Sequence, residues 1–163
     1  MLEQIGIDRQ IKKDIIKSIL SDTFKGCKIH YFDQGATWEI EDEEKLDDSS
    51  ICFSLIKNES EFPIMIEITR TPDENTLERG QYLAKIISDK LNCKTITNYK
   101  EQDKSLFYPS DSIIFEKGNA YFADDNNTIW ADGEGGEVKI LRKIVFENYK
   151  FDDLANLIKG KNC

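Results

Sequence analysis

The stretch from Phe62 to Asn92 constrains the fold most, because its hydrophobic pattern changes from a period of two to a helical period. In FPIMIEITR, Ile64, Ile66 and Ile68 alternate with Met65, Glu67 and Thr69, which predicts a strand with one buried face. The following residues predict an amphipathic helix that covers this face. Its apolar stripe consists of Leu77, Gly80, Ala84, Ile87 and Leu91, with Leu83 and Ile86 beside it.

Thr71, Pro72 and Glu74 predict where this helix begins. A threonine side chain can cap free amides of a first turn, and proline needs no amide there. Glu74 stands three residues after Thr71, the spacing of a capping box. The sequence therefore predicts a strand, a capped junction and a helix in succession.

Upstream, a helix is expected from Asp8 to Gly26, with Ile11, Ile15 and Ile19 on its apolar face. CKIHYFD and ATWEIED alternate and are expected to form a hairpin around Gln34-Gly35. SICFSLIKN is expected to be the next strand, so that four strands form a meander ending at FPIMIEITR.

Downstream of Asn92, the patterns CKTIT, SIIFEKGNAYFADD and EVKILRKIVF predict further strands. In the last of these, Val138, Ile140 and Ile144 are expected to point inward. Residues Phe151 to Ile158 predict a short closing helix with Leu154, Leu157 and Ile158 as its apolar face. The order is helix, four-stranded meander, helix, further strands and a short C-terminal helix, which predicts one α+β domain over residues 1–163 with a mainly antiparallel sheet.

Composition indicates a soluble globular protein. The chain has 163 residues, of which 39% are hydrophobic and 33% charged. It contains no apolar run near the roughly 18 residues that span a bilayer, and no basic-then-apolar secretory signal at its start. We interpret the four widely spaced cysteines as reduced thiols in a cytoplasmic protein. They are Cys27, Cys52, Cys93 and Cys163.

The net charge of −9 is concentrated in two short segments. Glu39 to Asp48 holds seven acids and one base, a net charge of −6. Asp124 to Glu137 holds five acids and no base, so the rest of the chain carries +2. This balance argues against a nucleic acid partner, because phosphates would be repelled. It favours a partner protein with a basic surface.

Candidate catalytic and metal-binding residues are few. His30 and Cys27 supply half of a zinc motif, and their odd offset places them on opposite faces of a strand. A cysteine–histidine nucleophile would need His30 to meet Cys52 or Cys93 in the fold. Glu67, in the middle of the predicted strand, could act as an acid or base if it is buried with a raised pKa.

The second acidic segment resembles a calcium loop in composition only. Counted from Asp124 or Asp125, the sixth position holds Ile129 or Trp130, where an EF-hand needs glycine. Gly133, Gly135 and Gly136 are followed by no P-loop lysine. The sequence predicts no metal, no cofactor and no enzymatic activity.

The two acidic segments and the aromatic residues near them are the best candidates for partner binding. Buried aromatic side chains anchor many interfaces, and acidic side chains would face a cationic surface. The alternative is that both segments are solvated loops. The candidate residues are Tyr31, Trp38, Glu41, Asp42, Glu43, Glu44, Asp47, Asp124, Asp125, Trp130 and Asp132.

In its length, α+β order, cytoplasmic character and acidity gathered beside aromatic residues, the chain resembles small acidic bacterial immunity proteins, including those of contact-dependent growth inhibition systems. The resemblance implies a protein that neutralises a cognate toxin, often a nuclease, by covering its basic active site. The chain also resembles type III secretion chaperones, which are small acidic dimers of α+β structure. A small enzyme using Glu67 or a cysteine is the third hypothesis. The resemblance rests on general features, so no family residue is carried over.

Overall fold

The computed structural model describes residues 3–33, 46–70, 74–100, 111–131, 133 and 135–158. Within these residues, eight strands form one sheet in the order β2-β3-β4-β1-β5-β6-β7-β8. All neighbouring strands are antiparallel except β2 and β3, which are parallel. This confirms the α+β class with a mainly antiparallel sheet. The strands are β1 (Glu3–Ile7), β2 (Lys28–Tyr31), β3 (Ser50–Lys57), β4 (Ile64–Arg70), β5 (Thr95–Asn98), β6 (Asp111–Glu116), β7 (Asn119–Asp124) and β8 (Lys139–Ile144).

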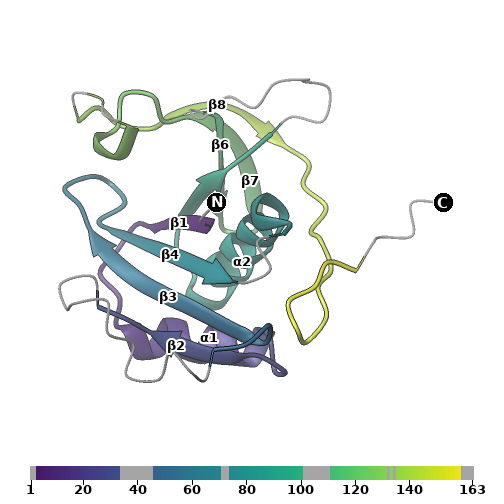
Figure 1. The fold of residues 1–163 in the computed structure, drawn as a ribbon. Coiled ribbons are helices and arrows are strands. Elements are labelled where there is room, and N and C mark those ends of the chain that lie inside the picture. The colour runs from purple at the N-terminus through teal and green to yellow at the C-terminus, as the bar shows by residue number, and fades with distance from the viewer. Residues whose placement is uncertain are drawn as a thin grey trace.

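Two helices cover one face of the sheet (Figure 1). They are α1 (Lys13–Thr23) and α2 (Thr76–Leu91), and neither is long and apolar enough to cross a membrane. The main core lies between them and the sheet, where apolar side chains of both helices meet residues of six strands. Its central members include Ile5, Ile7, Ile16, Leu20, Phe53, Ile66, Ile68, Leu83, Ala84, Ile87, Ile113 and Phe115.

The predicted strand and helix at the centre of the chain are confirmed. Ile66 and Ile68 of β4 share the main core with Ala84 and Ile87 of α2. Polar contacts fix the helix against β5, because Thr95 Oγ1 donates a hydrogen bond to the carbonyl of Ala84 at 2.8 Å. The change in hydrophobic period therefore identified both elements and the face they share.

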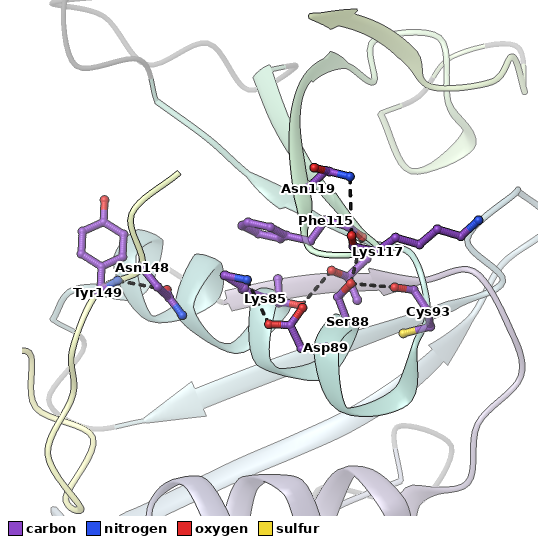
Figure 2. Close-up of polar contacts among 11 residues, drawn as sticks. Lys85, Ser88, Asp89, Cys93, Phe115, Lys117, Asn119, Asn148 and Tyr149 are labelled. Carbon is purple, nitrogen blue, oxygen red and sulfur yellow. Dashed lines mark hydrogen bonds and ion pairs between the residues drawn. The ribbon is translucent and has the colours of Figure 1, made fainter. Parts of the chain in front are cut away.

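Near the end of α2, a buried serine joins the helix to the sheet. Ser88 Oγ lies 2.7 Å from the carbonyl oxygen of Cys93 and 3.1 Å from that of Phe115 in β6 (Figure 2). One turn away on the exposed side, Lys85 and Asp89 form an ion pair at 2.9 Å. The same helix thus carries a structural polar contact on its inner face and a solvated ion pair on its outer face.

A second, smaller cluster lies on the opposite face of the sheet. It consists of Phe62, Ile96, Ile114 and Ala123, with Trp130 packed against it. Gly6 in β1 makes room for this cluster: a Cβ atom there would lie 2.7 Å from Ile96 Cγ2 and 3.2 Å from Phe62 Cβ. The small residue in the middle of a strand is thus explained by the close approach of Phe62.

The N-terminal elements differ from the prediction. Residues Glu3–Ile7 form β1, which lies between β4 and β5 and which the sequence reasoning missed. The helix α1 begins at Lys13 rather than after Asp8. The amide of Asp8 instead donates a hydrogen bond to the carbonyl of Lys94 at 3.1 Å, so Asp8 extends the contact of β1 with the start of β5.

The predicted cap of α2 is wrong. The helix begins at Thr76, and its N-cap is Asn75, which has a left-handed backbone with φ of 57° and makes no side-chain capping bond. Thr71 lies outside the described residues, five positions before the first helical residue, and is too far away to be the N-cap. The backbone carbonyl of Asn75 accepts the first helical hydrogen bond, from the amide of Arg79.

The predicted four-stranded meander is wrong at β2, whereas the hairpin within it is not tested by the described residues. The described neighbour of β2 is β3, in parallel, and parallel strands require a crossover rather than a tight turn. The other strand expected in the hairpin, residues 36–42, lies outside the described residues. The four-stranded meander is therefore replaced by a parallel pair, β2 and β3, followed by the antiparallel pair β3 and β4.

At the C-terminus, a compact loop replaces the predicted helix. Phe151 and Leu157 form an isolated antiparallel bridge, and Ala155 between them has a left-handed φ of 60°. Leu154 and Ile158, expected to be an apolar face, are 45% and 48% exposed. In β8, Ile140 is 48% exposed, so its predicted inward orientation is wrong as well.

Replacing Ile66 should test the core at its centre. Ile66 is fully buried, so we expect Ile66→Ala to lower the free energy of unfolding by roughly 2–5 kcal/mol in urea denaturation. The matched change Ile15→Ala, at a residue of α1 that is 42% exposed, should alter it by about 0.5 kcal/mol or less. Similar losses in both variants would contradict the position of the core.

Candidate functional site

The structure describes five of the eleven residues predicted to bind a partner. Tyr31 lies in β2 and Asp47 just before β3, whereas Asp124 ends β7 and Asp125 and Trp130 follow it. The other six lie outside the described residues, and they are Trp38, Glu41, Asp42, Glu43, Glu44 and Asp132.

The described members of the two acidic segments do not meet. Tyr31 belongs to the first strand in the sheet order and Asp124 to the seventh, with five strands between them. At about 4.8 Å for each of six steps, the path from β2 to β7 along the sheet is roughly 29 Å. The two segments therefore have to be considered as separate candidate surfaces.

Asp47 closes the crossover between β2 and β3. Its carboxylate accepts hydrogen bonds from the amide of Ser49 at 2.9 Å and from Lys28 Nζ at 3.0 Å. The bonds from Ser49 and Lys28 hold the pKa of Asp47 well below its usual range. Its side chain remains half-exposed, so Asp47 ties down the end of the acidic segment while staying at the surface.

Tyr31 is half-buried between β2 and α1. Its ring packs edge-on against Phe53, with 5.2 Å between the ring centroids, and Lys13 Nζ lies 4.7 Å from its centroid. Burial raises the pKa of the Tyr31 hydroxyl, and the nearby Asp33 adds to this effect. The aromatic ring thus contributes to the packing of the first helix on the edge of the sheet.

Asp125 organises the second acidic segment from inside. It is buried, and one of its carboxylate oxygens accepts hydrogen bonds from Ser112 Oγ at 2.8 Å and from Trp130 Nε1 at 3.0 Å. Burial raises the pKa of Asp125, and the two donors offset part of the rise. The Trp130 ring packs edge-on against Phe62 of the second cluster. Asp125 and Trp130 therefore stabilise the fold of this turn. A partner-binding role for the second acidic segment stays a prediction.

Glycine allows the chain to close this turn. The amide of Gly133 donates a hydrogen bond to the carbonyl of Thr128 at 2.9 Å, and that of Gly136 to the carbonyl of Asn127 at 2.7 Å. A Cβ atom on Gly133 would lie 2.4 Å from the carbonyl carbon of Asn127, which leaves room for glycine alone. The glycine-rich run is therefore explained by the close approach of its backbone to residues Asn127 and Thr128 within the turn.

The residues considered for catalysis lie in ordinary structural settings. Glu67 is half-buried and accepts a hydrogen bond from Gln4 Nε2 at 3.1 Å. His30 and Cys52 are paired in register across β2 and β3, so the sheet brings them together as the sequence reasoning required. Burial raises the pKa of the Cys52 thiol, however, and no hydrogen bond joins the two side chains among the described residues. Burial also raises the pKa of Cys27, and that of Cys93 to about 11, so these thiols stay protonated at neutral pH.

No group of three or more candidate metal ligands occurs within the described ranges. Of the half motif for zinc, Cys27 lies just before β2 and His30 lies within it, and Cys27 Sγ is directed at the carbonyl of Asp153.

The sequence reasoning missed a buried cluster of charged residues. Arg79 in the first turns of α2 forms an ion pair with Glu3 of β1, and both side chains are almost wholly buried. Arg79 also donates to the carbonyl of Glu74 at 3.0 Å. Arg70, at the end of β4, and Arg79 both donate to the carbonyl of Ala155 in the C-terminal loop. The sequence signal that could have revealed this cluster was a charged residue within the apolar pattern of each of two consecutive elements, Arg70 in β4 and Arg79 in α2.

Comparison of the chain with protein-family models, with curated proteins and with solved structures finds no match.

Neutralising Glu3 should reveal how strongly the fold depends on this ion pair. Glu3→Gln leaves the buried guanidinium of Arg79 without its carboxylate, so we expect a loss of about 3–5 kcal/mol in the free energy of unfolding. The matched change Asp89→Asn breaks the exposed ion pair of the same helix and should cost about 0.3–0.5 kcal/mol. Equal losses would mean that the buried pair contributes no more than a surface pair.

Substituting Asp125 should give a pH-dependent change in stability. Because its folded pKa is raised above 3.8, the stability that the protonated carboxyl contributes is fully present below that pH and is lost as the pH rises through the folded pKa. Asp125→Asn keeps an acceptor for Ser112 and Trp130 without the charge, so it should gain stability relative to the original protein between about pH 4 and pH 7. Asp125→Ala should cost about 1–3 kcal/mol, because both donors lose their partner.

Urea denaturation at about pH 4 and at about pH 7 measures the stability of each variant. Asp124→Asn, at the half-buried neighbouring residue, is the control. An Asp125→Asn variant whose stability follows that of the original protein at both pH values would contradict the raised pKa.

Proposed function

We propose that this chain is a cytoplasmic, non-enzymatic binding protein, and that it is an immunity protein that neutralises a basic toxin by covering its active site. The observation that carries the proposal is the concentration of charge in one connection of the fold. The acidic segment from Glu39 to Asp48, net −6, joins β2 to β3 at one edge of the sheet. Its described end, at Asp47 and Asp48, is exposed.

The settings of the ionisable groups favour binding over catalysis. A nucleophilic cysteine needs a lowered pKa, whereas burial raises the pKa of Cys27, Cys52 and Cys93. The buried carboxylate of Glu3 is paired with Arg79, which is the arrangement of a structural ion pair. Among the described residues, these groups are explained by packing and hydrogen bonding, and the net charge of −9 is the feature that needs a partner.

The two acidic segments have unequal roles in this proposal. Asp125 and Trp130 are held by each other and by the second cluster, so they stabilise their turn. The first segment has more acids, and of its two described acids Asp47 anchors the chain before β3 while Asp48 is exposed. We therefore assign the main binding role to Glu41, Asp42, Glu43 and Glu44, with Trp38 and Tyr31 as neighbouring aromatic residues.

The expected mechanism is electrostatic steering followed by close contact. A cleft of a nuclease that binds phosphates is basic, so a cluster of carboxylates is attracted to it and competes with the substrate. Steering raises the rate of association, and aromatic residues at the interface then slow dissociation.

Co-expression with the product of the neighbouring gene tests the proposal. If that product arrests growth, expression of this chain should restore growth, and the two proteins should purify together as a complex that lacks the toxic activity. A growth arrest that persists although both proteins are soluble would reject the immunity role.

Charge reversal in the first acidic segment should slow association with such a toxin. A variant with lysine at positions 41 to 44 should associate about tenfold or more slowly at low salt, and the difference should shrink at high salt because the charges are screened. Stopped-flow fluorescence at two salt concentrations measures both effects. An unchanged unfolding midpoint of this variant would show that the fold survives the four substitutions.

A second variant with the same change in net charge serves as the control. It carries lysine at four exposed acidic positions elsewhere, Asp22, Glu59, Glu147 and Asp153. An equal loss of rate in this control would mean that total charge alone steers the partner, and would remove the special role of the segment.

A further inference from the structure

The strand β8 is the last strand of the sheet, at the end opposite β2 (Figure 1). Among the described residues it pairs with β7 on one side, and no strand lies on its other side. An edge strand presents a row of backbone N–H and C=O groups that another strand can pair with.

The side chains of β8 distinguish it from the rest of this acidic protein. Its six residues, KILRKI, include three bases and no acid, and five of the six are exposed. Ile140 and Leu141 are 48% and 46% exposed, and Val145, directly after the strand, is fully exposed. Basic and apolar side chains are thus interleaved along an open edge in a chain whose net charge is −9.

We propose that the edge of β8 binds an acidic, extended segment of a partner protein, which adds a strand to the sheet. Backbone hydrogen bonds would hold the segment, and side chains of alternating character would select it. Its acidic side chains would lie beside Lys139 and Lys143, and its apolar side chains would cover Ile140 and Leu141. This partner differs in charge from the basic toxin of the proposed function, so the two surfaces are independent.

Charge argues against a second copy of this chain as the occupant. Two β8 strands paired edge to edge would place Lys139, Arg142 and Lys143 of one copy beside the same three residues of the other. Like charges on neighbouring strands are destabilising. An acidic segment replaces this repulsion with attraction at the same positions.

The geometry of β8 also limits the length of the segment. Its register with β7 shifts between Phe122 and Ala123, because Ala123 is opposite Ile140 and Phe122 is opposite Arg142. Leu141 is the extra residue of this bulge, and a bulge bends its strand. A short segment therefore fits the edge better than a long, flat strand does.

The experiment uses the full chain and two short capped peptides, one of alternating valine and glutamate and one of alternating valine and lysine. Isothermal titration should show binding of the glutamate peptide and at least tenfold weaker binding of the lysine peptide. Hydrogen exchange followed by NMR should show slower exchange of β8 amides in the presence of the glutamate peptide, because only pairing with the edge protects them.

Lys139→Glu combined with Lys143→Glu should weaken binding of the glutamate peptide at least tenfold. The control variant, Lys17→Glu with Lys25→Glu, makes the same change in net charge at two exposed lysines near the other edge and should affect binding less than twofold. An equal effect of the two variants, or protection of amides outside β8, would overturn the proposal. So would a dimer in sedimentation that only the β8 variant dissociates, because a second copy would then occupy the edge.

Discussion

The buried ion pair of Glu3 and Arg79 connects three parts of the fold that are far apart in sequence. Glu3 belongs to β1 in the interior of the sheet, and Arg79 begins the inner face of α2. Arg79 and Arg70 also hold the carbonyl of Ala155, so the C-terminal loop closes over the same charges. A buried charge is tolerated only when it is paired, and each of these elements is therefore required in its observed position.

Periodicity predicted the elements that have long patterns and clear faces. The isoleucines of β4 and the stripe of α2 meet as expected, because burial of one face requires that spacing. Short elements with polar residues inside were missed. β1 has only five residues. Glu3 is buried in an ion pair with Arg79, and Gly6 is buried against Phe62, so the strand shows no clear alternation of apolar and polar residues. Such partners are defined by tertiary contacts and not by the local sequence.

For the candidate site, the sequence could predict only which segments are rich in acidic residues. The sequence shows where acids are concentrated, but burial decides which of them face a partner. Asp125 and Asp124 are adjacent and chemically identical, yet Asp125 is buried beneath Ser112 and Trp130. The separation of the two acidic segments depends on the sheet order, in which β1 is inserted between β4 and β5. Since the sequence reasoning missed β1, it could not place the segments relative to each other.

Opposite charges on one small protein act over different distances. A basic partner would be attracted during its approach by the net charge of −9, which is concentrated in the two acidic segments. The three bases of β8 are felt only within roughly a Debye length of 8–10 Å, since beyond that salt and the surrounding acids cancel them. An acidic strand therefore gains nothing from steering and depends on contacts made at the edge itself. If both proposals hold, long-range charge would select the basic partner, and short-range pairing on β8 would select the acidic one.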